Sequence, residues 1–150
     1  MDDPVHRYLE AQNAGHPSAF DRALIELRSG RKCTHWIWYV LPQLQGLGRS
    51  ALAQRYGLRG IEEAKTYLAH PLLLSRLMRV IAVISDQLEH PSQTLELLMG
   101  SSLDAAKTIS CLTLFEAAGL ETASGLLDRL GRRCSKTKVL LSAPPTRISN

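Results

Sequence analysis

One long interval of this sequence lacks acidic residues, which limits the chemistry that the interval can perform alone. Between Glu26 and Glu62 there is no carboxylate, although six Lys or Arg fall in the same 35 positions. Such a segment cannot by itself supply an Asp or Glu general base, or an oxygen-rich site for a hard metal ion. An enzyme built on it would need His35 as the base, or a carboxylate such as Asp104 or Glu116 brought in by folding.

Cysteine is also scarce. Cys33, Cys111 and Cys134 are odd in number, widely spaced and form no Cys-x-x-Cys pair. This spacing argues against a disulfide framework or a zinc site, and it is typical of a reducing compartment. We predict no metal and no cofactor.

A long uncharged apolar run is missing as well. The longest apolar stretch, residues 71–88, contains two arginines and one aspartate, whereas a membrane span needs about 20 nearly uncharged residues. The first four residues are partly acidic, and no apolar signal segment follows them. We therefore expect a cytoplasmic protein with no membrane partner.

The residues that are present favour one helical domain. The 150 residues are 45% hydrophobic and 21% charged, as in ordinary globular domains. Apolar residues recur at helical spacing, and strand-like alternation is scarce, so we predict an all-α fold. We expect an irregular multihelical single domain over residues 1–142, with about eight short helices around one long buried helix, and a frayed tail over residues 143–150.

Capping residues and glycines give the expected helix limits. The predicted helices cover residues 5–14, 18–29, 51–56, 61–69, 71–88, 92–99, 103–118, 120–130 and 135–141. The helix over 71–88 has a narrow polar stripe, so we expect most of its circumference to be buried. Residues 36–41 are rich in aromatic and β-branched side chains, which favours a strand, but Thr34 is a plausible helix cap. We predict a short buried helix there.

Several linked motifs occur between Leu27 and Leu74. They are Gly30-Arg31-Lys32, His35-Trp36-Ile37-Trp38, Pro42-Gln43 and Leu47-Gly48-Arg49-Ser50. This succession resembles the family catalogued as domain of unknown function 1810, over about Tyr8 to Phe115. The resemblance implies a multihelical single domain found mostly in bacteria, with no established activity. After Phe115 the sequence is more basic than the family pattern, and we expect it to depart from the family there.

The acid-free interval contains a candidate ligand site. Its residues combine cationic donors for an anion, indole faces for stacking and one imidazole that titrates near neutrality. The predicted site residues are Arg31, Lys32, His35, Trp36, Trp38, Gln43, Arg49 and Ser50. Together they would suit a small anionic, nucleotide-like ligand.

Each part of this site also has a structural interpretation. The tryptophans can be core residues, and in a helix Trp36 and Trp38 point about 200° apart, so that one of them belongs to the core. Cys33 and His35 form a conceivable catalytic dyad, but free cysteines are usually buried hydrophobes. The loop from Gly46 to Ser50 resembles a phosphate cradle, but the more economical interpretation is a glycine turn with Ser50 as a helix cap.

Two functional hypotheses remain open. The first is a protein that binds a small anionic ligand at residues 35–43, with or without processing it. The second is a non-enzymatic interaction domain with a structural aromatic core. In the second, the basic segment from Asp128 onward, which contains six Lys or Arg and one acid, would meet an acidic partner or nucleic acid. No nucleic-acid-binding motif accompanies these residues, so nucleic acid is the less favoured partner. The sequence fixes neither a reaction nor an oligomeric state.

Overall fold

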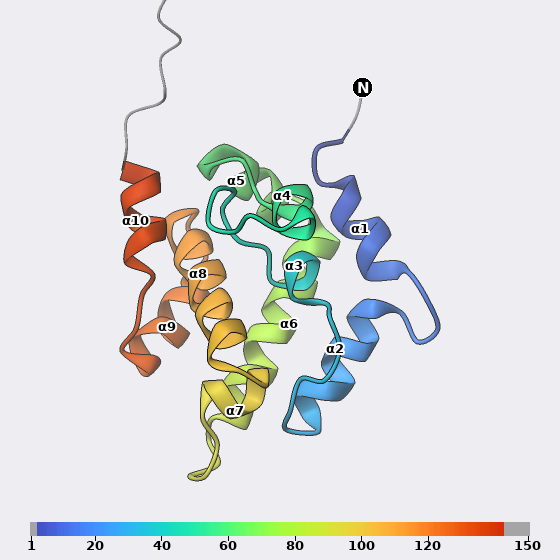
Figure 1. Ribbon diagram of the computed structural model, residues 1–150, viewed down its shortest axis with the longest axis vertical. Coiled ribbons are helices and arrows are strands. Elements are labelled where there is room, and N and C mark those ends of the chain that lie inside the picture. Colours follow the sequence, from blue (N-terminus) through green and yellow to red (C-terminus); the bar gives the residue numbers. More distant parts are fainter. Residues whose placement is uncertain (1–2, 143–150) are drawn as a thin grey trace, which may run out of the picture.

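The computed structural model describes residues 3–142, and within them the chain forms ten helices and no strand (Figure 1). The helices are α1 (His6–Asn13), α2 (Ala19–Arg28), α3 (Ile37–Val40), α4 (Ala51–Tyr56), α5 (Ile61–Ala69), α6 (Pro71–Gln87), α7 (Leu95–Met99), α8 (Ser102–Ala117), α9 (Glu121–Leu130) and α10 (Ser135–Ser142). The all-α prediction is confirmed. The tail predicted over residues 143–150 lies outside the described residues.

Two long helices, α6 and α8, run through the middle of the molecule (Figure 1). Helix α6 packs against α2, α5, α7 and α9, while α8 packs against α3, α5, α7, α9 and α10. Helices α1 and α2 lie on one side of this pair, and α9 and α10 lie on the other (Figure 1). The short helix α3 connects α1 and α4 with α8, so the aromatic segment lies where the two sides meet.

The most buried helix is α8, which corrects the expectation that the helix over 71–88 would be enclosed. Helix α6 buries one face, and its apolar Leu72 and Met78 are exposed. In α8, residues 108–115 are all buried. Its hydroxyl residues permit this burial because Thr108 and Thr113 donate to carbonyls one turn earlier in the same helix, which satisfies their polar groups.

Local capping explains most helix limits. Ser18 and Ser50 accept hydrogen bonds from backbone amides of the first turns of α2 and α4, as the sequence predicts. Helix α7 begins at Leu95, later than expected, because Thr94 is its capping residue. The short helix predicted within residues 36–41 is confirmed as α3, and the nearby extended pairing is an isolated bridge between Leu44 and Leu58.

Among residues 3–142, no single helix is long and apolar enough to cross a membrane. Within the same residues, α5 and α6 together would have the length and hydropathy of a span, but these two helices are bent by 96° relative to each other.

Candidate functional site

The loop before α3 is held by one buried carboxylate, Glu26 of α2. Its Oε1 accepts hydrogen bonds from the backbone amides of Cys33 and Thr34, at 2.7 and 2.9 Å, and from the Trp36 indole at 2.9 Å. The Thr34 hydroxyl donates to Oε2. Four donors therefore converge on Glu26. In the sequence, this residue was notable only as the last acid before the acid-free interval.

These donors determine the ionisation of Glu26. Burial by itself raises the pKa of a carboxyl group, because it disfavours the charged form. Here the hydrogen bonds from Thr34, Cys33 and Trp36 outweigh burial and lower the pKa of Glu26 to about 2. Glu26 is thus a carboxylate at neutral pH that orders the loop over residues 33–36.

Lys32 takes part in a second internal contact. Its Nζ lies 2.8 Å from Asp104 Oδ2, donates to the Thr34 carbonyl at 2.7 Å and lies 5.2 Å from the centre of the Trp36 ring. Only 8% of Lys32 is exposed. Asp104 was one of two carboxylates that folding was expected to bring to the acid-free interval, and it does lie there. Its charge, however, is paired with that of Lys32. Glu116, the other alternative, pairs instead with Arg133 at 2.7 Å.

The two tryptophans have different environments. Trp36 is 1% exposed and belongs to the core, whereas Trp38 is half-buried. The Lys107 ammonium of α8 lies 4.8 Å from the centre of the Trp38 ring, within cation–π distance. The prediction that one of the two belongs to the core is confirmed.

A cavity of about 370 Å³ opens beside Trp38, and we call it the cationic cavity. Its basic residues come from three parts of the chain: the loop before α4, helix α8, and the start of α10. Its lining residues are Trp38, Gln43, Leu47, Gly48, Arg49, Ser50, Ala53, Leu103, Ala106, Lys107, Ser110, Cys134 and Lys136. Four of the predicted site residues, Trp38, Gln43, Arg49 and Ser50, are thereby brought together.

The charges around the cationic cavity have one sign. Arg49, Lys107 and Lys136 line it, and no carboxylate among the described residues does so. Lys107 also contacts an acid outside the lining, since its Nζ lies 3.6 Å from Asp104 Oδ1. Since Asp104 is also bound more closely by Lys32, this contact leaves the cavity with an excess of positive charge.

The loop from Gly46 to Ser50 supplies one wall of the cationic cavity. Ser50 Oγ accepts from the Ala53 amide at 3.1 Å, as a helix cap does. Gly48 packs so closely on α4 that an added Cβ would lie 2.8 Å from the Ala53 Cβ. The loop is therefore a capped glycine turn that contributes a wall and the Arg49 side chain.

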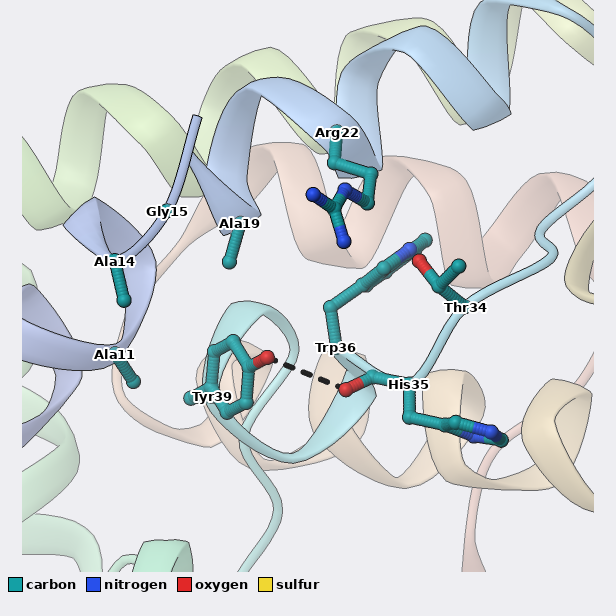
Figure 2. A pocket seen from close by; sticks show the side chains of 9 residues that line it. All are labelled: Ala11, Ala14, Gly15, Ala19, Arg22, Thr34, His35, Trp36 and Tyr39. Carbon is teal, nitrogen blue, oxygen red and sulfur yellow. Dashed lines mark hydrogen bonds between the residues drawn. The ribbon is translucent and has the colours of Figure 1, made fainter. Parts of the chain in front are cut away.

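The remaining predicted residues lie in two other hollows. Arg31, Lys32 and His35 line an open cleft with Asp104 at the start of α8. His35 and Trp36 line a separate cavity between α1, α2 and α3. There, the His35 carbonyl accepts a hydrogen bond from the Tyr39 hydroxyl, and its imidazole points away from Tyr39 (Figure 2). The eight predicted residues therefore form parts of three hollows.

No arrangement for metal binding or for a Cys–His dyad stands out in the described part of the chain. Over residues 3–142, no three His, Cys, Asp or Glu side chains converge as metal ligands. The Cys33 thiol is exposed and contacts the Arg31 carbonyl at 3.5 Å.

Two basic residues of the cationic cavity, Lys107 and Lys136, were not among the predicted site residues. Lys107 belongs to a row on α8, since Leu103, Ala106, Lys107 and Ser110 share one face at helical spacing. The sequence spacing predicts that these residues share a helix face, but nothing in the sequence indicates that this face packs beside Trp38.

Comparison with known proteins places the chain in a family. Residues 2–141 match the family described as "Protein of unknown function (DUF1810)". The chain belongs to this family. The match includes the basic segment after Gly131, so the family extends past Phe115, where we expected the resemblance to end. Helices α9 and α10 remain part of one core with α8, where Ser110 and Thr137 hydroxyls are 3.1 Å apart and Cys134 N donates to Thr113.

One solved structure has a similar overall arrangement. The crystal structure of the conserved hypothetical protein Rv1873 from Mycobacterium tuberculosis is 36% identical in sequence, with a TM-score of 0.83. The similarity covers 95% of this chain and 100% of that chain. No curated protein matches the sequence.

Proposed function

We propose that this protein binds a small anionic ligand that carries a planar or apolar group, in the cationic cavity. The observation that supports the proposal most directly is the convergence of Arg49, Lys107 and Lys136 around half-buried Trp38, with no lining carboxylate among residues 3–142. Guanidinium and ammonium groups are the usual partners of phosphate oxygens. A phosphorylated nucleoside or sugar fits this combination.

The walls match the uncharged part of such a ligand. Leu47, Leu103 and Ala106 provide apolar surface, and Trp38 adds an aromatic ring. Gln43 offers both an amide donor and a carbonyl acceptor, which can read a polar edge. The proposal is for binding and assigns no catalytic step.

The alternative, a basic carboxy-terminal surface for an acidic partner, has less support. Arg132 pairs with Glu96 at 2.7 Å, and Arg133 pairs with Glu116 and Asp128 at 2.7 Å each. The hydrogen bonds to Glu116 and Asp128 raise the pKa of Arg133. Both arginines are therefore paired with carboxylates of the same chain. Lys136, by contrast, lines the cationic cavity.

We also infer that the protein binds its ligand in a bacterial cytoplasm. The three free cysteines support a reducing compartment, and the similar solved protein comes from a bacterium.

A thermal-shift comparison of charged and uncharged partners tests the proposal. Binding to the folded state raises the unfolding midpoint, so nucleoside monophosphates and sugar phosphates should stabilise the protein, and nucleosides and free sugars should do so far less. The stabilisation should fall in Lys136→Gln and persist in Lys138→Gln. The latter is the matched control, because Lys138 is exposed on the same helix but does not line the cavity.

Salt supplies a second readout. Arg49 and Lys136 are exposed to solvent, so their attraction for an anion should be screened as ionic strength rises. Equal stabilisation by nucleosides and nucleotides, or equal stabilisation of Lys136→Gln and wild type, would rule out the cationic cavity as the anion site.

A further inference from the structure

A second cavity, separate from the cationic cavity, lies between α1, α2 and α3, and we call it the Arg22 cavity (Figure 2). Its volume is about 250 Å³. Its lining residues are Ala11, Ala14, Gly15, Ala19, Arg22, Thr34, His35, Trp36 and Tyr39. We propose that the Arg22 cavity binds a small monocarboxylate with a compact aromatic or branched body.

Arg22 is the only Lys, Arg, Asp or Glu residue that lines the Arg22 cavity within the described part of the chain. Arg22 lies on the exposed side of α2, and its guanidinium points from that helix toward Trp36 and Tyr39 (Figure 2). Across residues 3–142 its guanidinium makes neither an ion pair nor a hydrogen bond. A guanidinium in this state can bind a carboxylate through two parallel hydrogen bonds.

The neighbouring hydroxyls favour a carboxylate over a phosphate. The Tyr39 hydroxyl donates to the His35 carbonyl at 3.2 Å, and the Thr34 hydroxyl donates to Glu26. With their hydrogens engaged, both oxygens meet a ligand as acceptors. The guanidinium alone can satisfy a carboxylate through two parallel hydrogen bonds, whereas a phosphate dianion needs further donors, which these two hydroxyls do not supply.

Size and wall composition define the rest of the ligand. Four of the lining residues are Ala or Gly, which keeps the space open, while Trp36 and Tyr39 provide aromatic surface. An apolar cavity of about 150 Å³ can hold benzene. The Arg22 cavity therefore has room for a six-membered ring and a short acid group.

The test uses the two tryptophan indole N–H signals in nitrogen-15 NMR spectra, because Trp36 lines the Arg22 cavity and Trp38 lines the cationic cavity. Trp38→Phe assigns the two signals by removing one. Phenylacetate at millimolar concentration should move the Trp36 signal. Benzyl alcohol should bind at least tenfold more weakly, and phenyl phosphate should not bind more tightly.

Two variants assign the effect to Arg22. Arg22→Gln should weaken phenylacetate binding about tenfold or more, as expected for the loss of a charged hydrogen-bonding partner. Arg28→Gln, an exposed arginine of the same helix outside the cavity, should leave binding unchanged. Ala14→Leu, at an exposed wall position, should block the cavity while circular dichroism shows the fold intact.

The proposal is overturned if phenylacetate leaves the Trp36 signal unmoved, if Arg22→Gln binds as wild type does, or if phenyl phosphate binds more tightly. These results concern Trp36 and Arg22. They are therefore distinguishable from failure of the cationic cavity, which concerns Trp38 and Lys136.

Discussion

At the scale of single residues, Glu26 links α2 to the loop that precedes the aromatic helix. Its carboxylate accepts hydrogen bonds from two backbone amides, one hydroxyl and one indole. Removing the charge leaves buried donors with a poorer acceptor and places an amide N–H₂ against them, which is costly. Glu26 therefore determines whether Trp36 and its neighbours keep their positions.

We predict that Glu26→Gln lowers the free energy of unfolding by about 3 kcal/mol. Urea denaturation at neutral pH measures the change. Glu10→Gln is the control, since Glu10 is exposed and its one ion pair among residues 3–142 is with exposed His6. Its effect should stay within about 0.5 kcal/mol.

The Glu26 contribution should also depend on pH. The folded-state pKa is about 2, below the ordinary value of about 4.3 expected for the unfolded chain. A lowered pKa contributes stability above the unfolded value, and this stability is lost as the pH falls through the folded value. The difference in stability between wild type and Glu26→Gln should therefore be full above about pH 5 and narrow steadily toward pH 2. A difference that stays constant over this range would contradict the assignment.

Lys32 should behave as a structural residue. Lys32→Ala removes the closer cation from the Asp104 carboxylate and leaves the longer contact to Lys107. We therefore expect a loss of about 2 kcal/mol in the free energy of unfolding. Lys65→Ala removes an exposed ion pair with Glu62 and should cost less than about 0.5 kcal/mol. Equal effects in chemical denaturation would show that the Lys32–Asp104 contact adds nothing.

At the scale of elements, the junction between α7 and α8 holds the backbone of Lys32, which precedes the loop over residues 33–36. The Lys32 amide donates to the Leu98 carbonyl of α7 at 2.7 Å. Gly100 ends α7 with a φ of +86°, and a Cβ there would lie 2.9 Å from the Lys32 carbonyl oxygen. Both the backbone conformation and the close contact require glycine.

Two glycine substitutions should accordingly have opposite signs. Gly100→Ala should destabilise the protein by about 1–3 kcal/mol, because of strain and contact with Lys32. Gly125→Ala, in the interior of α9 where an added Cβ meets open space, should stabilise it by about 0.5–1 kcal/mol. Thermal unfolding of both variants gives the comparison, and destabilisation of similar size at the two positions would contradict it.

Helix positions were largely predictable, because caps and glycines act locally. Ser18, Ser50 and Gly100 act at the helix ends where the sequence places them. The contact partners were not predictable in the same way. The Glu26 network and the meeting of Lys107 with Trp38 depend on which helix faces pack together, and periodicity gives a helix face without naming its neighbour.

At the scale of the whole molecule, the acid-free interval does not form a single site. Folding pairs Lys32 with Asp104, buries Trp36 against Glu26, and leaves Trp38 and Arg49 to meet basic residues of α8 and α10. The sequence prediction of an anion site near residues 35–43 stays a prediction. We propose the cationic cavity beside Trp38 as its location. Lys32 is not part of this proposal, because it is paired with Asp104.

Nitrogen-15 NMR titration of the two indole signals with adenosine monophosphate, and separately with pyrophosphate, shows whether the cationic cavity is the anion site. We expect both anions to move the Trp38 signal and to leave the Trp36 signal in place. Lys136→Gln should weaken the response, and Lys138→Gln should not. A Trp38 signal that stays fixed at millimolar concentrations of both anions, or a response confined to Trp36, would contradict the assignment of the cationic cavity.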